Sequence, residues 1–176
     1  MRNKKGVIWV STVLYILISL AILSIVLVSV QPIINKNRDK AVLYQSESML
    51  REIDSTIMKA SDREGTILTS NVKISRGNLI INSSSDRIIF LLKDSSYQYS
   101  EENKTIKTGK IYSETRKVNG KWQVLMYLDY KQGNTENWYD LTYAGSGSVK
   151  TLSEADYVLS FENVNMTSRH IDVRVS

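Results

Sequence analysis

The stretch Val7–Val30, VIWVSTVLYILISLAILSIVLVSV, decides the fold of this chain. Nineteen of its 24 residues are hydrophobic, and no charged residue occurs from Gly6 to Asn35. As a helix with a rise of roughly 1.5 Å per residue, the stretch would be about 36 Å long, enough to cross the hydrocarbon core of a bilayer. The sequence therefore predicts a transmembrane segment over residues 7–31 of the 176, and it argues against a wholly soluble protein.

The net charge of +5 comes mainly from the N-terminal tip of the chain. Arg2, Lys4 and Lys5 supply three of these charges, whereas residues 7–176 hold 20 basic and 18 acidic side chains. Positive charge beside an apolar segment marks the cytoplasmic side of a membrane. We therefore expect a single-pass cell-membrane protein with a cytoplasmic N-terminus and an external C-terminal domain, and we expect no nucleic-acid partner.

A second, amphipathic helical segment follows over residues 36–61. Leu43, Leu50 and Ile57 lie seven residues apart and form an apolar stripe that we expect to pack on a folded head. Pro32 is the only proline in the chain, and it predicts a kink or a short unwound stretch between the two segments. Polar residues ending in Gly65 then predict the end of the helix.

From residue 65 to residue 176 the sequence predicts a β-rich head. Short runs of alternating or β-branched residues are separated by turn signals, of which Asn119-Gly120 is the strongest. No run suits a helical crossover, so the predicted fold class is α+β, with a long N-terminal helix followed by an antiparallel β-sandwich-like head. The predicted strands are Thr66–Ile74, Asn78–Asn82, Arg87–Lys93, Tyr97–Ser100, Thr105–Arg116, Lys121–Lys131, Tyr139–Ala144, Ser148–Leu152, Asp156–Asn163 and Ile171–Val175.

The residues Lys4-Lys5-Gly6 directly before Val7 and the apolar run resemble the class III signal peptide of type IV prepilins, specifically that of archaeal type IV pilin-like proteins. The resemblance implies that a prepilin peptidase cuts between Gly6 and Val7 and removes residues 1–6 as a basic leader. Ser11 stands at the fifth mature position, where many pilins carry glutamate, and this departure is less typical of a major subunit.

The same resemblance implies a structural subunit, a pilin or minor pilin, of a surface filament used for adhesion, motility or secretion. Its apolar helices would form the filament core and its head the exterior. The implied partners are copies of itself, other pilin-like subunits, the membrane, the prepilin peptidase, and an assembly platform with its ATPase. The residues expected to form the membrane and filament helix include Trp9, Ser11, Leu14, Leu17, Leu20, Leu23, Leu27 and Pro32.

A permanent anchor is the alternative to a filament subunit. In that interpretation the apolar helix stays in the membrane, and the external β domain binds a ligand or scaffolds an envelope complex. The long apolar run and its charge asymmetry fit both hypotheses. The form of the mature N-terminus distinguishes them.

We expect no enzyme, no cofactor and no bound metal. The chain has no cysteine and one histidine, His170, which excludes disulfides, zinc–thiolate sites and histidine clusters. The acidic residues lack calcium-loop spacing. A set of His170, Asp172 and a serine is the strongest catalytic candidate, but alternation with apolar neighbours predicts that His170 points to solvent. Gly145-Ser146-Gly147-Ser148 precedes no helix and is predicted to be a hairpin loop.

Two further surface features are candidates for function. Alternating tyrosines are typical of half-buried sheet packing, with an adhesive surface as the alternative. Three sequons predict candidate glycosylation at Asn82, Asn103 and Asn165 if the head is external. The tyrosines concerned are Tyr97, Tyr99, Tyr127, Tyr130, Tyr139 and Tyr143.

Overall fold

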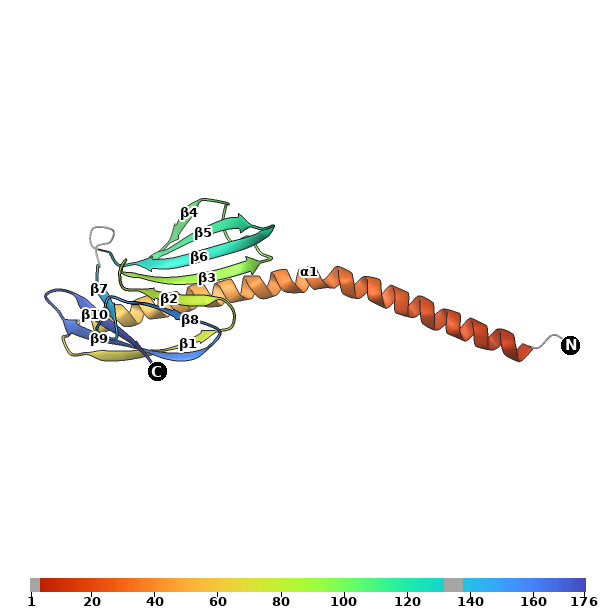
Figure 1. Cartoon of the computed structure of the whole chain (residues 1–176), viewed down its shortest axis with the longest axis horizontal. Helices are drawn as coiled ribbons and strands as arrows, with labels where there is room; N and C mark the ends of the chain where they lie inside the picture. The colour runs from red at the N-terminus through yellow and green to blue at the C-terminus, as the bar shows by residue number, and fades with distance from the viewer. Residues whose placement is uncertain (1–3, 132–137) are drawn as a thin grey trace. The chain divides into compact units, whose positions relative to one another are not determined.

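The computed structural model describes residues 4–131 and 138–176, with side chains from Trp9 onward. The chain consists of one helix and ten strands within these residues (Figure 1). It divides into two compact units, Met1–Arg38 and Asp39–Ser176. We call the second unit the head. The predicted α+β class, with a long N-terminal helix and a β-rich head, is confirmed.

The helix α1 covers Lys4–Ala60 and includes Pro32. The backbone remains helical through the proline, so the predicted short unwound stretch is wrong. Proline lacks an N–H and removes one intrahelical hydrogen bond, which the neighbouring turns tolerate here. The predicted end is confirmed, since α1 stops before the polar turn that contains Gly65, whose φ is +75°. By length and composition, α1 is able to cross a membrane.

The head contains a four-stranded sheet in the order β1-β9-β10-β7. Within the described residues its strands pair antiparallel, except that β10 runs parallel to β7. This parallel pair differs from the prediction of a fully antiparallel head. The strands are β1 Ile67–Ile74, β7 Asp140–Tyr143, β9 Ala155–Asn165 and β10 His170–Val175.

A six-stranded sheet in the order β4-β5-β6-β3-β2-β8 completes the head, and its strand pairs are antiparallel. Asn119 and Gly120 both have positive φ values, of 49° and 77°, which confirms the predicted tight turn between β5 and β6. The strands are β2 Asn78–Asn82, β3 Arg87–Ser95, β4 Thr105–Thr108, β5 Ile111–Val118, β6 Lys121–Asp129 and β8 Val149–Leu152.

Two strand predictions are wrong. The predicted strand Thr105–Arg116 is divided into β4 and β5 by a turn at Gly109, where φ is +64°. The predicted strand Tyr97–Ser100 is irregular, because the hydroxyl of Ser95 donates to the carbonyl of Tyr97 at 2.9 Å and accepts from the N–H of Tyr97 at 3.0 Å. A side chain that bonds to local backbone groups competes with strand pairing.

The amphipathic part of α1 packs into the core of the head, as the stripe predicted. Leu43, Leu50 and Ile57 are fully buried, and they belong to one hydrophobic cluster with inward side chains from both sheets. Figure 1 shows this part of α1 running alongside both sheets. Inward side chains of the cluster include Val72, Leu79, Phe90, Met126, Leu128, Leu141, Leu152, Leu159, Phe161, Ile171 and Val173.

Polar contacts at several positions along α1 fix it against the segments that directly follow strands of the head. Asp39, 1% exposed, forms an ion pair with Arg76 and accepts a hydrogen bond from the N–H of Ser96. Further along, the hydroxyl of Tyr130 donates to Asp54 at 3.0 Å. Because a displaced helix would leave these buried groups unpaired, the contacts define a single position for this segment within the head.

Candidate functional site

The apolar segment Trp9–Ile34 of α1 is the most unusual surface of the described chain. Eighteen large apolar side chains in it are between 40% and 76% exposed. Side chains on every face of the helix share this exposure, so no single face is set aside for a packing partner. Fully burying one large apolar side chain is worth about 1.5–3 kcal/mol. By length and composition, this exposed apolar segment is able to cross a membrane. The predicted helix residues Trp9, Ser11, Leu14, Leu17, Leu20, Leu23, Leu27 and Pro32 are all exposed.

Serine hydroxyls within this segment bond to their own helix. Ser19, Ser24 and Ser29 donate to the carbonyls of the residues four positions earlier, at 2.8, 2.8 and 2.9 Å. Such bonds satisfy a hydroxyl inside an apolar surrounding without any partner chain. These three hydroxyls therefore do not require a second helix, and they do not prevent the segment from exchanging lipid for apolar neighbours.

The predicted peptidase junction lies at the beginning of α1. Lys4, Lys5, Gly6 and Val7 belong to its first turns, and their side chains lie outside the described part of the structure, as do residues 1–3 of the predicted leader. Cleavage after Gly6 therefore stays a prediction.

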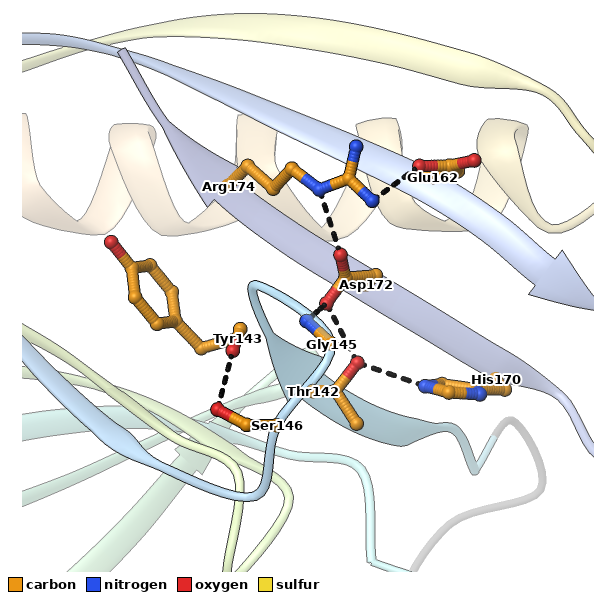
Figure 2. Close-up of polar contacts among 8 residues, drawn as sticks. All are labelled: Thr142, Tyr143, Gly145, Ser146, Glu162, His170, Asp172 and Arg174. Atoms are coloured by element: carbon orange, nitrogen blue, oxygen red, sulfur yellow. Dashed lines mark hydrogen bonds and ion pairs between the residues drawn. The ribbon is translucent and has the colours of Figure 1, made fainter.

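The strongest catalytic candidate, His170, lies in a hydrogen-bonded network on β7 and β10 (Figure 2). His170 is half-buried, and its Nε2 lies 2.8 Å from the hydroxyl of Thr142. The prediction that His170 points to solvent is therefore wrong. The parallel partner strand β7, which alternation within β10 does not reveal, supplies this hydroxyl.

The order of groups in this network does not suit nucleophilic catalysis. The Thr142 hydroxyl donates its one proton to Asp172 Oδ1 at 2.7 Å, so His170 Nε2 must donate to the same hydroxyl oxygen. A nucleophile needs the opposite arrangement, in which the imidazole accepts the hydroxyl proton. We interpret the network as a structural link between β7 and β10.

Asp172 is the centre of the same network and is 1% exposed. Besides Thr142, it accepts hydrogen bonds from the N–H of Gly145 at 2.7 Å and from Arg174 Nε at 3.0 Å. Arg174 also pairs with Glu162 at 3.0 Å. Figure 2 shows the carboxylate enclosed by these donors. Because both oxygens have partners, the buried charge is compensated without a ligand.

The turn that contains Gly145 is not the predicted hairpin loop. Gly145-Ser146-Gly147-Ser148 connects β7 of the four-stranded sheet to β8 of the six-stranded sheet. The bond to Asp172 and the bond from the Ala144 N–H to the Val173 carbonyl, at 3.0 Å, hold the turn against β10. The segment is therefore a crossover between the sheets.

The tyrosines do not gather on one surface. Tyr130 and Tyr139 are buried and meet edge to face, with ring centroids 5.7 Å apart. Burial, followed by the nearby charge of Asp54, raises the pKa of Tyr130 well above its ordinary value. Tyr127 stacks on Tyr112 at 5.2 Å. Most of the six tyrosines thus serve packing or hydrogen bonding, and Tyr97, Tyr99 and Tyr143 are half-buried against the core.

The three sequons differ in accessibility. Asn103 and Asn165 are exposed, whereas Asn82 is half-buried at the end of β2, and its side-chain oxygen accepts the N–H of Ser85 at 3.2 Å. Glycosylation stays a prediction at all three. Among the residues that the structure describes, no cluster of three or more histidine, aspartate or glutamate side chains is arranged to hold a metal ion.

Two features escaped the sequence-based predictions. The first is the buried pair of Asp39 and Arg76, which are 37 positions apart. The second is a cavity of about 390 Å³ beside the end of α1, lined in part by the buried Asn163. No spacing signal marks either feature, because the residues are brought together only when α1 packs against distant parts of the head.

The chain was compared with known protein families, with curated proteins and with solved structures, and no match was found.

Proposed function

We propose that this chain is a type IV pilin-like subunit, archaeal in style, of a surface filament that serves adhesion, motility or secretion. The exposed apolar segment Trp9–Ile34 carries the proposal. In the membrane before assembly, lipid would surround this helix. In the filament, the helices of neighbouring subunits would take the place of the lipid.

The energetics favour such an exchange. Lipid tails and apolar helices offer a similar surrounding to aliphatic side chains, so little solvation free energy opposes transfer between them. Residues Gly6 to Asn35 carry no charge, so no charged group of this segment would have to change its surroundings. The self-bonded serines likewise add no unsatisfied group. The head, which buries its own core, would form the exterior.

The resemblance of Lys4-Lys5-Gly6 and the following residues to a prepilin signal supplies the second argument. In this proposal a prepilin peptidase removes residues 1–6, and an assembly platform with its ATPase extracts the mature helix. Ser11 in place of glutamate favours a minor subunit. The alternative function is that of a permanently anchored protein with an external ligand-binding or scaffold domain, for which the same apolar segment is sufficient.

The mature N-terminus separates the two functions. Mass spectrometry of the protein purified from membranes should find a chain that begins at Val7. A chain that begins at Met1 or Arg2 would support the permanent anchor instead.

A matched pair of variants tests whether processing leads to assembly. Gly6→Phe places a bulky side chain at the cleavage position and should leave the leader uncut and abolish filaments seen by electron microscopy. Asn3→Gln changes the same leader conservatively and should leave both processing and filaments intact. Filaments built from uncleaved Gly6→Phe protein would contradict the proposal.

A further inference from the structure

A band of positive charge directly follows the apolar segment of α1. Lys36, Arg38 and Lys40 are all exposed, and we call these three residues the basic collar. The collar begins two residues after Ile34, the last residue of the apolar segment. From Asn35 to Ser46, a range that the structure describes in full, no other exposed residue carries a charge. The exposed charges next to the apolar segment are therefore all positive.

The acidic residue within this stretch is turned away from the surface. Asp39 is 1% exposed, forms an ion pair with Arg76 and accepts a hydrogen bond from the N–H of Ser96 at 2.6 Å. In the sequence, residues 36–40 carry three positive charges and one negative charge. Because the negative charge is neutralised in a buried ion pair, the collar presents all three of its positive charges outward.

Two tyrosine rings support the last cation of the collar. The Nζ atom of Lys40 lies 5.9 Å from the ring centroid of Tyr44 and 5.9 Å from that of Tyr97. Tyr44 is 52% exposed and Lys40 is exposed as well, so the ammonium stays at the surface. Cation–π contacts at exposed sites are weak and do not neutralise the charge. Lys40 therefore remains available to an anionic partner.

Lipid phosphates come within reach of the collar when the apolar segment lies in a membrane. At roughly 1.5 Å per residue, the three cations follow Ile34 by about 3, 6 and 9 Å along the helix. A helix longer than the hydrocarbon core tilts, which keeps its apolar end near the boundary of the core. The headgroup layer beyond that boundary is about 5–8 Å thick. Each cation then lies within about one Debye length, 10 Å at 0.1 M salt, of the phosphates.

From these observations we propose that the basic collar binds anionic lipid headgroups of the membrane that holds the apolar segment. Phosphate oxygens accept hydrogen bonds and carry negative charge, whereas the collar offers only donors and positive charge. Each lysine or arginine near an anionic membrane surface strengthens binding by up to about fivefold. The inference rests on the membrane insertion that the filament subunit and the permanent anchor share, and it requires neither cleavage of the leader nor filament assembly.

The test places the full chain in phosphatidylcholine vesicles at about 0.1 M salt. The probe is a trace of spin-labelled phosphatidylglycerol or, separately, of spin-labelled phosphatidylcholine. Electron paramagnetic resonance measures the fraction of each label whose motion the protein restricts. We call the ratio of the two association constants the anionic selectivity, and it should be at least about fivefold in favour of phosphatidylglycerol.

Replacement of the whole collar, by Lys36→Gln, Arg38→Gln and Lys40→Gln in one chain, should lower the anionic selectivity at least about threefold. The measure is this decrease rather than the selectivity itself, because the cations at the N-terminal tip of the chain also attract anionic lipid. When the Debye length is shortened to about 3 Å by 1 M salt, the decrease should disappear.

The matched control removes three other exposed cations, by Lys59→Gln, Arg63→Gln and Arg169→Gln in one chain. Lys59 and Arg63 lie at the C-terminal end of α1 and directly after it, and Arg169 lines the cavity beside that end. This end is about 30 Å along the helix from Lys40, several Debye lengths away. The control should leave the anionic selectivity unchanged, and circular dichroism should show the same folded head in both variants.

The outcomes separate this proposal from the proposed function. Equal selectivity with and without the collar, an equal decrease in the control variant, or a decrease that persists at the higher salt concentration would overturn the collar as a lipid site. Restriction of the phosphatidylcholine label in the same samples would still support membrane insertion, on which the proposed function depends. No restriction of either label would contradict insertion and overturn both.

Discussion

Between Trp9 and Ile34 the helix α1 exposes 18 large apolar side chains, whereas between Val42 and Ala60 it buries seven apolar residues in the head. One continuous helix thus contains a first segment whose apolar side chains are exposed and a second segment whose apolar side chains are buried. In the second segment the partners of the apolar stripe are parts of the same chain. In the first segment the apolar side chains have no such partners in the head, and in the proposed function lipid or other helices would supply them.

The polar residues of the two segments differ in the same way. In the first, the serine hydroxyls bond to their own backbone. In the second, Ser46 and Thr56 also bond to their own backbone, but acidic side chains bond to residues of the head outside the helix, as Asp54 does to Tyr130 and Glu47 to Tyr99. Directional bonds to distant residues fix a single position, while self-contained bonds leave the helix free to change its neighbours. This difference is what a subunit that moves from lipid to filament would require.

The largest expected effect is the difference in head stability between two substitutions of the same type, one in each segment. Ile53→Asp places a carboxylate in a fully buried position of the head core, where an unpaired charge costs several kcal/mol and should prevent the head from folding. Leu20→Asp, at a position that is 54% exposed, should leave the folding of the head unchanged. Denaturant unfolding of the full chain in detergent, followed by circular dichroism, measures both.

Leu20→Asp should instead act on the membrane step. A charged residue at the centre of a transmembrane helix costs about 2.5–3.5 kcal/mol on insertion scales, so less protein should be recovered in the membrane fraction and in filaments. If Leu20→Asp lowered the unfolding free energy of the head as much as Ile53→Asp, the contrast between the two segments would be wrong.

The sequence predicted the features that depend on local pattern. The apolar run from Val7 predicts the exposed segment, and the spacing of Leu43, Leu50 and Ile57 predicts the face that packs on the head. Asn119-Gly120 predicts the turn between β5 and β6. Each of these signals lies within a few helical turns or one hairpin, so it can be read from neighbouring residues alone. The short unwound stretch predicted at Pro32 is wrong, since the single missing N–H does not interrupt α1 there, while the kink stays a prediction.

Features that depend on distant pairing could not be predicted. From alternation within β10 alone, Asp172 would be an outward residue. In the structure β7 lies parallel to β10, and the N–H of Gly145 donates to the Asp172 carboxylate. Asn163 and Ser61 lie 102 positions apart, and they meet only because β9 returns to the end of α1. A single sequence contains no periodicity that reports either contact.

A smaller effect tests the directional bonds of the buried segment. Tyr130 is only 3% exposed, and its hydroxyl donates to Asp54 at 3.0 Å. Tyr130→Phe removes this hydroxyl. A hydrogen bond to a charged group is worth about 1.5–3 kcal/mol, and the unfolding free energy of the head should fall by that amount. Denaturant titration measures the change.

Tyr112→Phe is the matched control for this bond. Tyr112 stacks on Tyr127 and is half-buried, and removal of its hydroxyl should change the stability by less than about 0.5 kcal/mol. Equal losses in the two variants would mean that the bond to Asp54 does not contribute beyond ring packing.

The smallest effect concerns Glu47 and depends on pH. The hydrogen bond from Arg51 is the main cause that lowers the pKa of Glu47 below its ordinary value of 4.5, with burial opposing it and the Tyr99 hydroxyl adding to it. A lowered folded-state pKa gives stability that is present above pH 4.5 and is lost as the pH falls through the folded-state value. Arg51 is half exposed, so solvent screening limits the contribution to less than about 1 kcal/mol.

Glu47→Gln should therefore lower the unfolding free energy slightly at pH 7, and the difference from the unaltered protein should shrink as the pH falls below 4.5. Ser48→Ala, at the exposed neighbouring position of α1, should show no such dependence on pH. A difference that stayed constant from pH 7 to pH 3 would assign the loss to the shape of glutamine rather than to the charge of Glu47. The bond to Tyr99 would then fix the helix by geometry alone, and the contrast with the self-bonded serines would rest on the buried contacts of Asp39 and Asp54.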